Sequence, residues 1–361
     1  MDRLEVAHRR LHNHRLSGPP LPDPAAVVRH LGASQAQEYA MAKWSLGQRS
    51  AGADDAAVQA ALDAGAILRT HVLRPTWHFV APEDLRWMLA LTGPRVRQTS
   101  RYYERRSGID DDLVDRATAA MGEALQGGRH LTRPELQDAL ARAGIEASGI
   151  RLAYLVMAAE LAAVVVSGVL RGKQRTYALV DERVPAAPTP DPDEALAELT
   201  RRYFVSHGPA TVKDFRWWSS LTLTQIRRGL AIVGEDLTSA DVDGLTYWFA
   251  PADAPERDPS PTVHVLQGYD EYGVAYTEGR TAANIADLTV APATTNQVIQ
   301  PLVLDSQVVG WWRRVVERDG IVAEPHLAVP LDAAQRAAAR AAFDRLGRFA
   351  GMPVRLESGS S

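Results

Sequence analysis

The sequence predicts an α+β fold in which three helical units, each closed by a β-hairpin, are followed by a smaller β-rich unit. Three observations carry this prediction. Apolar residues recur at helical spacing in three successive groups of segments, and each group ends in a run of β-branched and aromatic residues. Pro-rich stretches at residues 183–193 and 251–261 separate the later groups. With 361 residues, of which 46% are hydrophobic, the chain is long enough for several cores.

The first unit is expected over residues 1–108. Its helices are expected over residues 24–31, 34–46 and 54–62, with Pro24 and Ser34 at positions that suit helix starts. Residues 67–73 and 77–80 predict a hairpin with its turn around Arg74 and Pro75. Three helices followed by a hairpin is the winged-helix arrangement, in which the third helix usually enters a groove of DNA.

The same order of elements recurs twice along the chain. The second unit, residues 109–183, is expected to contain helices over 111–125 and 149–161, a capping box from Thr132 to Glu135, and strands over 163–167 and 175–180. The third unit, residues 193–250, is expected to contain helices over 193–207, 210–219 and 224–233 and a strand over 245–249. Residue identity between the units is weak, so the repeat is one of architecture.

A β-rich, barrel-like unit is expected over residues 261–357. Short strands are predicted over residues 263–266, 297–304 and 307–312, with turn residues between them. A helix over 331–349 is expected to close this unit.

Composition excludes several classes of protein. Because the chain has no cysteine, disulfides, thiolate nucleophiles and Cys-type metal sites are excluded. The phosphate-binding loop, the nucleophile elbow and the zinc-protease motif do not occur, and no grouping of histidines and carboxylates has metal-ligand spacing, so we expect no cofactor and no metal. No apolar leader or membrane-length segment is present, which predicts a cytoplasmic protein without a membrane partner. The net charge of -4 means that any DNA site must be local.

A pair of glutamines, Gln35 and Gln37, is the first candidate for chemistry. Residues two apart cannot share one face of a continuous helix, so we place the pair at a helix start. There, two side-chain amides can project into a groove and hold a water molecule or a sugar oxygen. From these residues alone, an exposed helix start whose amides cap the backbone is the simpler interpretation.

Three longer blocks accompany this motif in order: residues 67–87, 208–218 and 266–272. With them, the Gln-Ala-Gln motif resembles the AlkZ and YcaQ type of winged-helix DNA glycosylases, and the resemblance extends from about residue 11 to residue 356. It implies a C-shaped protein of three winged helices with a β-rich C-terminal portion. It also implies catalytic roles for Gln35 and Gln37.

The implied reaction is the excision of alkylated purines from double-stranded DNA, including bulky or cross-linked adducts, in DNA repair or self-resistance. A purine alkylated at N7 already carries positive charge, so it leaves without a strong general acid, and the sugar passes through an oxocarbenium-like state. Two amides that fix a water against C1′ would act by proximity and preorganised electrostatics. We expect a monomer that associates with the nucleoid in the cytoplasm.

Seven further residues are candidates for contacts with DNA: Lys43, Arg69, Arg74, Trp77, His78, Arg97 and Arg101. The arginines belong to a basic run between residues 69 and 106, which suits a phosphate-binding strip. A solvated helix face with ion pairs to Glu83, Asp84 and Glu104 is the alternative. His78 either contacts a phosphate, orients a catalytic amide or is structural, and Trp77 is either a platform for a base or part of the core.

Two other functions fit tandem winged helices. One is a non-enzymatic DNA-binding regulator, in which Gln35 and Gln37 read base edges or cap a helix. The other is sequestration of a DNA-alkylating natural product in a cleft without chemistry. A regulator should show sequence preference and commonly dimeric symmetry, whereas a glycosylase should act on lesions in many sequence contexts.

Overall fold

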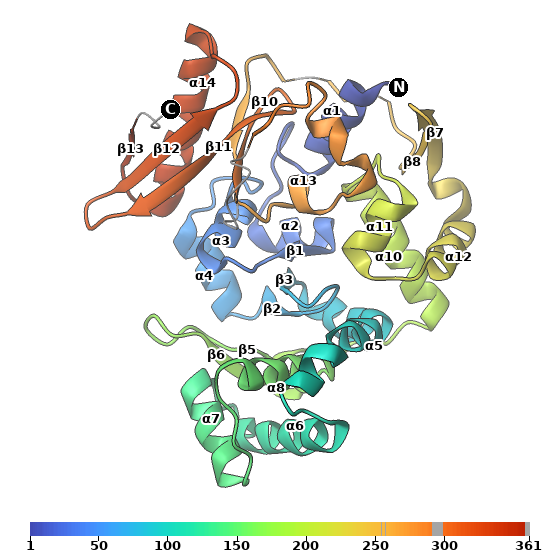
Figure 1. Cartoon of the computed structure of the whole chain (residues 1–361), viewed down its shortest axis with the longest axis vertical. Helices are drawn as coiled ribbons and strands as arrows, with labels where there is room; N and C mark the ends of the chain where they lie inside the picture. Colours follow the sequence, from blue (N-terminus) through green and yellow to red (C-terminus); the bar gives the residue numbers. More distant parts are fainter. Residues whose placement is uncertain (254, 257, 291–298, 358–361) are drawn as a thin grey trace.

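The computed structural model describes residues 1–253, 255–256, 258–290 and 299–357. The fold is mixed α/β, and about half of the chain is helical. Residues 109–183 form the lower part of the molecule in Figure 1, the hairpin of residues 68–80 lies above them, and the C-terminal sheet lies at the top. Within the described residues, no helix is both long and apolar enough to cross a membrane.

The first unit contains most of the predicted elements. Helix α1 (Arg3–Asn13) precedes them, and α5 (Pro82–Arg106) follows. Between these lie α2 (Pro24–Leu31), β1 (Ala33–Gln35), α3 (Tyr39–Gly47), α4 (Asp55–Asp63), β2 (Leu68–His71) and β3 (Trp77–Val80). Helix α2 begins where expected because Pro24 occupies its first turn and the Asp23 carboxylate accepts the N–H of Ala26.

The helix predicted from Ser34 to Leu46 is wrong in its first part. Residues 33–35 form strand β1, which pairs antiparallel with β3 so that Gln35 lies opposite His78. The next amide, that of Ala36, donates to the carbonyl of Trp77 at 2.7 Å. These backbone groups therefore find partners on a neighbouring strand, which a continuous helix would not provide. Gln35 stands on a strand, and Gln37 lies in the connection before α3.

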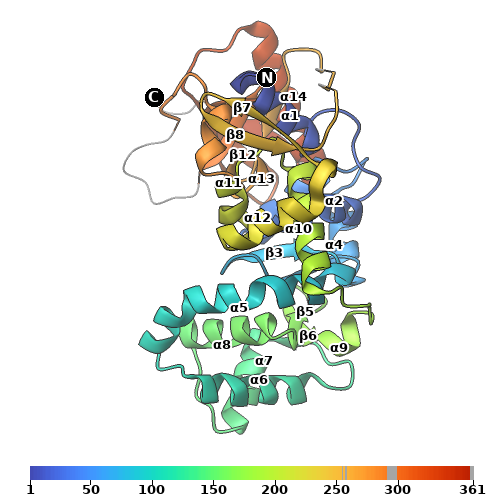
Figure 2. The ribbon, with the colours of Figure 1, turned by 90° about the vertical axis from the view of Figure 1, so that its right-hand side faces the viewer.

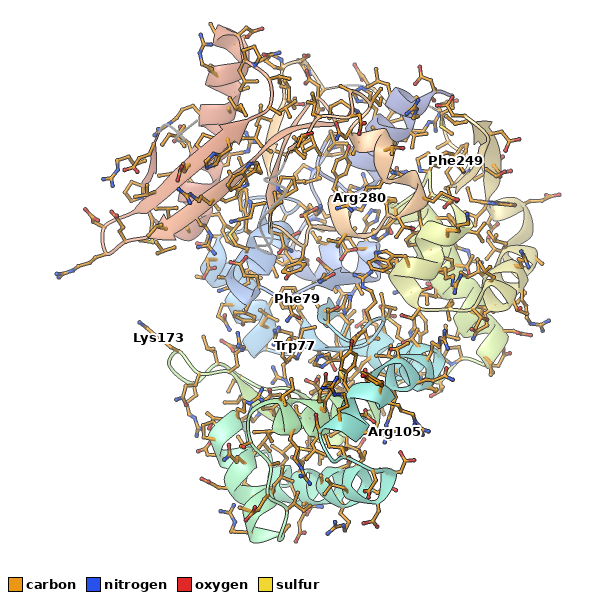
Figure 3. All side chains as sticks on the ribbon, in the orientation of Figure 1. Trp77, Phe79, Arg105, Lys173, Phe249 and Arg280 are labelled. Carbon is orange, nitrogen blue, oxygen red and sulfur yellow. The ribbon has the colours of Figure 1, made fainter. Side chains whose placement is uncertain are left out.

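The second unit confirms its predicted helices and capping box. It consists of α6 (Asp111–Leu125), β4 (Leu131–Thr132), α7 (Arg133–Arg142), α8 (Gly149–Leu161), β5 (Val165–Ser167) and β6 (Thr176–Leu179), followed by the short α9 (Val180–Arg183). Thr132 and Glu135 form the reciprocal capping box at the start of α7. Figure 2 shows α5 lying along α8 at the top of this unit. Lys173 lies at the tip of the connection between β5 and β6 (Figure 3).

The third unit has the same order of elements. It consists of α10 (Pro192–Ser206), α11 (Val212–Ser219), α12 (Leu223–Val233), the 3-10 turn η1 (Gly234–Asp236), β7 (Thr238–Val242) and β8 (Leu245–Phe249). An isolated bridge between Ala210 and Trp248 stands where the first strand of the other units lies. The first two units thus run helix, strand, helix, helix, strand, strand, and in the third the bridge takes the place of the first strand. The sheet orders β1-β3-β2 and β4-β6-β5 correspond strand for strand.

The C-terminal part forms a curled half-barrel sheet of five strands within the described residues. Its elements are β9 (Val263–Val265), α13 (Glu271–Val274), the 3-10 turn η2 (Glu278–Ala283), β10 (Gln300–Leu304), β11 (Gln307–Val316), β12 (Ile321–Leu327), α14 (Ala333–Ala350) and β13 (Val354–Leu356). The predicted strand over 297–304 is confirmed from residue 300, whereas residues 297 and 298 lie outside the described residues. Strands β12 and β13 were not predicted.

Two shared cores join these units. One contains residues of α2, α3, β9, β10 and α14, and here Trp44 packs against Phe349 with ring centroids 5.3 Å apart. The other joins β2, β3 and α5 to the helices of the third unit, including Phe215 and Trp218. Consequently the strand that carries Gln35 lies between the C-terminal part and the third unit.

Candidate active site

Gln35 lines an open cleft of about 780 Å³. The cleft is bounded by residues of β1, the turn between β2 and β3, α5, α11 and the segment around α13. Four of the lining residues are cationic, namely Arg74, Arg95, Lys213 and Arg216, and none of the described lining residues is a carboxylate. Lys213 also forms an ion pair with Glu278 at 2.5 Å. This concentration of positive charge on a chain of net charge -4 suits a polyanion.

Three hydrogen bonds fix Gln35. Its side-chain Oε1 accepts from Arg74 Nη2 at 2.8 Å. Its backbone N–H donates to Glu271 Oε1 at 2.7 Å, and its carbonyl accepts from Gln267 Nε2 at 3.2 Å. The residue as a whole is only 5% exposed. Residues more than 230 positions later in the chain therefore hold both backbone groups of Gln35.

Glu271 is fully buried and connects this strand to the third unit. Its Oε2 accepts the indole N–H of Trp218 at 2.9 Å, and His207 Nε2 lies 3.5 Å from the same oxygen. Burial lowers the pKa of His207, although the nearby Glu271 carboxylate opposes this shift. A carboxylate with two protein donors and no exposure is a holding group rather than a base for substrate.

A buried ion pair supports the same segment from the other side. Asp270 accepts from Arg49 Nη2 at 2.7 Å and from Arg49 Nη1 at 2.9 Å, and neither side chain is exposed to solvent. The hydroxyl of Ser45 donates to Asp270 at 2.6 Å. Although burial raises the pKa of Asp270, the guanidinium of Arg49 holds it below its ordinary value. The segment 266–272 is thus fixed to α3.

His78 lies behind the cleft and is fully buried. Its Nδ1 lies 2.9 Å from the carbonyl of Thr76, so Nδ1 carries the proton and Nε2 accepts, facing Arg74 Nη2 at 3.5 Å. Burial, reinforced by the charge of Arg74, holds the pKa of His78 well below its ordinary value. The ring is buried and neutral, and its place beside Arg74 suits the alternative of a supporting or structural residue.

Gln37 is exposed and is not among the residues that line the cleft. Its Oε1 accepts only a long hydrogen bond of 3.4 Å from the backbone N–H of Trp77. The two glutamines thus differ sharply: the amide of Gln35 is held, and that of Gln37 faces solvent.

Lys43 and Arg69, two of the candidates for contacts with DNA, are buried and bound to groups of the protein itself. Lys43 is buried, and its Nζ donates to Asp55 at 2.7 Å. Arg69 is 7% exposed and donates to the carbonyl of Ala36 at 3.0 Å, while its guanidinium stacks 4.3 Å from the ring centre of Trp77. Burial, with a smaller contribution from Arg175, lowers the pKa of Arg69 to about 10. Arg69 thus holds the motif segment through Ala36, whereas Lys43 joins α3 to α4.

Arg97 and Arg101 lie on α5 and form ion pairs with carboxylates. This arrangement agrees with the alternative of an ion-paired helix face rather than with a phosphate-binding strip. Arg97 donates to Asp111 at 2.7 Å, and Arg101 lies 3.4 Å from the same carboxylate. Arg97 also lies 3.8 Å from Glu104. Of the seven candidates for DNA contact, the structure therefore brings only Arg74 into the cleft with Gln35.

Several residues at this site were not among the site residues predicted from the sequence. Besides Glu271 and Gln267, these are Lys213, Arg216 and Trp217 of α11. Trp217 is 52% exposed, and its indole N–H donates to the carbonyl of Val274 at 2.8 Å. The available signal was the pair of blocks at 208–218 and 266–272, which contain all five residues. Among the described residues, no group of three or more potential ligands could hold a metal ion.

Comparison with known proteins points to one family. A family model described as DNA glycosylase AlkZ-like matches residues 28–349. An interstrand DNA cross-link repair glycosylase of Streptomyces sahachiroi is 27% identical over 358 residues, which is 93% of this chain and 94% of that protein. The solved structure of the DNA glycosylase AlkZ from S. sahachiroi matches with a TM-score of 0.77 and 23% identity, covering 99% of this chain and 100% of that chain. This last likeness shows that the two chains share a fold.

Proposed function

Because the chain belongs to the AlkZ-like DNA glycosylase family, whose members hydrolyse N-glycosyl bonds, we propose that it is a monofunctional glycosylase for alkylated purines of the N7-alkylguanine type. The name of its S. sahachiroi relative, an interstrand cross-link repair glycosylase, adds bulky and cross-linked adducts to the proposed substrates. The cellular role is then DNA repair or self-resistance against an alkylating agent.

The cleft around Gln35 is the observation that carries this proposal. Four cationic side chains border it, and its described lining contains no carboxylate. Phosphate contacts supply most of the sequence-independent affinity of proteins for DNA, which is what a repair enzyme needs. The proposed partner is therefore double-stranded DNA, bound by a monomer.

The chemistry fits a site without an acid. In an N7-alkylated nucleotide the C1′–N9 bond breaks with its electron pair moving to the cationic purine, which leaves as a neutral base. Water forms the new bond to C1′ and loses its proton to solvent. We assign Gln35 and Gln37 to this step, because amides can orient the water and the base without a proton transfer of their own. Unmodified purines, which are poorer leaving groups, should be excised slowly or not at all.

The proposed architecture is three tandem winged helices in a C-shaped arrangement. The first two units share the order helix, strand, helix, helix, strand, strand and have matching sheet orders, β1-β3-β2 and β4-β6-β5, and the third unit has the same order with an isolated bridge in place of the first strand. These features support the proposal. We propose the unit boundaries 1–108, 109–183, 193–250 and 261–357 on the same grounds.

The test is release of N7-methylguanine and of a bulkier N7-alkylguanine from duplex DNA under single-turnover conditions. The wild type should release both bases, and Gln35→Ala and Gln37→Ala should lose most of this activity. Gln137→Ala, at an exposed position of α7, is the matched control. DNA binding without release of either base would exclude this glycosylase activity and leave a DNA-binding regulator or the sequestration of an alkylating natural product.

A further inference from the structure

We propose that Gln35 works as a hydrogen-bond donor whose orientation is set by Arg74, and that its amide NH2 contacts an acceptor atom of the departing purine. Arg74 is then a positioning residue. This inference rests on the proposed glycosylase function and assigns separate roles to the two glutamines of the motif.

The contact with Arg74 determines which way the Gln35 amide points. A guanidinium has five N–H donors and no acceptor. The atom of Gln35 that lies 2.8 Å from Arg74 Nη2 is therefore the carbonyl oxygen, because the reversed amide would place N–H against N–H. Glu271 and Gln267 hold the backbone N–H and carbonyl of the same residue, which keeps its side chain directed at Arg74.

Arg74 is itself held in place. The residue is 8% exposed, and its Nη1 donates to the carbonyl of Trp218 at 3.4 Å. Within the described part of the chain it forms no ion pair, so no carboxylate competes with Gln35 for the guanidinium. A cation bound to an amide oxygen draws electron density from the amide and strengthens its N–H groups as donors.

The opposite end of the amide is the available one. Gln35 lines the cleft, and no described protein group accepts a hydrogen bond from its Nε2. A polarised donor without a protein partner thus faces the space where substrate is proposed to bind. Gln37, whose oxygen is not bound to a cation, is left to supply the acceptor that orients the water.

A donor at this position favours the transition state over the bound substrate. As the C1′–N9 bond breaks, its electron pair returns to the purine, and ring acceptors such as N3 gain electron density. A hydrogen bond from Gln35 to such an atom becomes stronger during the reaction, which is the condition for accelerating the chemical step. Removing one such preorganised donor from an enzyme typically costs about 10²- to 10³-fold in rate.

The decisive variant is Gln35→Glu, with single-turnover release of N7-methylguanine as the measurement. The substitution preserves shape and the acceptor for Arg74 but removes both N–H donors. We expect a loss of about 10²-fold or more in rate. If Gln35 instead served as an acceptor or stabilised the cationic sugar, a carboxylate would match or exceed the wild-type rate, and that result would overturn the inference. Gln137→Glu is the matched control for the same change at an exposed position.

The role of Arg74 is tested by a double-mutant cycle with Arg74→Met and Gln35→Met. If Arg74 acts through Gln35, the double variant should lose no more rate than Gln35→Met alone. Arg74→Lys, which keeps a cationic N–H donor, should recover part of the rate that Arg74→Met loses. A double variant whose loss in rate equals the product of the two single losses would contradict the positioning role. An effect of Arg74→Met on DNA affinity alone would contradict it as well.

A measurement without turnover separates this inference from the proposed activity. The side-chain NH2 resonance of Gln35, assigned by its absence in Gln35→Glu, should move when Arg74 is replaced by Met. An unchanged resonance would refute the contact even in an active enzyme. If the resonance moves but the wild type releases no base, the proposed function fails while the orientation of Gln35 stands, and its assignment to the departing purine is withdrawn.

Discussion

Replacing Asp270 by Asn tests whether the buried ion pair with Arg49 holds the segment that supports the motif strand. Asp270 receives two hydrogen bonds from Arg49, one from Ser45 and one from the backbone of Tyr272, and it is not exposed to solvent. The amide of Asn cannot accept from both guanidinium nitrogens and the hydroxyl in this geometry. Arg49 would then remain buried with an uncompensated charge.

The expected cost follows from the burial of both partners. Removing one member of a buried ion pair typically destabilises a protein by about 3–5 kcal/mol. An entropy of unfolding of about 2.1 cal/mol/K per residue gives roughly 0.8 kcal/mol/K for 361 residues, so the melting temperature should fall by about 4–7 °C. Asp112→Asn is the control, because its ion pair with Arg116 is exposed and should contribute less than about 1 kcal/mol.

Thermal unfolding at several pH values provides the assay. Because the pKa of Asp270 lies below its ordinary value in the folded protein, the pair stabilises the fold above about pH 4 and this contribution is lost as the pH falls further. The difference in melting temperature between the wild type and Asp270→Asn should therefore be constant from pH 5 to pH 8 and shrink below about pH 4. A melting temperature within about 1 °C of the control at neutral pH would refute the reasoning.

Three further predictions concern the cleft and two histidines, His30 and His264. Glu271→Gln should lower the single-turnover excision rate by about 10- to 100-fold with little change in DNA affinity, because the motif strand loses its anchor; a change in affinity alone would contradict this. The double substitution Lys213→Ala and Arg216→Ala should weaken DNA binding. It should also reduce the slope of the logarithm of the binding constant against the logarithm of the salt concentration by about one per lost phosphate contact. An unchanged slope would mean that DNA binds elsewhere on the protein. Burial lowers the pKa of His30 and of His264 to about 4, so these rings stay neutral in the folded protein. The free energy of unfolding should accordingly reach its full value above pH 6.5 and fall towards pH 4, by up to about 3 kcal/mol per ring. Urea titrations at several pH values should show a weaker pH dependence of this free energy in His264→Gln than in the wild type.

The sequence predicts the helices well because their signals are local. Apolar spacing and caps such as Asp23 before α2 and Thr132 before α7 lie within the elements that they define. Strand β1 was missed because it has three residues and its partner β3 lies more than 40 positions later. The same limit applies to β13, a three-residue strand that pairs in parallel with β12.

For the candidate site, residue type identified the motif but not its surroundings. Gln35 and Arg74 were named from the sequence, and the structure places them in contact. Lys43 and Arg69 were candidates for contacts with DNA, yet each is buried with its own partner. Glu271 could not be found from its own neighbourhood, since a carboxylate after a strand becomes informative only when its distant partner is known.

The hydrogen bonds from Glu271 and Gln267 to the backbone of Gln35 also set an order of events during synthesis. The ribosome releases the motif strand long before it makes the segment that anchors this strand, and the remaining strands of the half-barrel come later still. A prematurely terminated chain that ends in the Pro-rich stretch at 251–261 would contain both glutamines and all four basic side chains of the cleft, but not the anchor of the motif strand. Truncated products would therefore carry a motif without its support, and base excision would await a nearly finished chain.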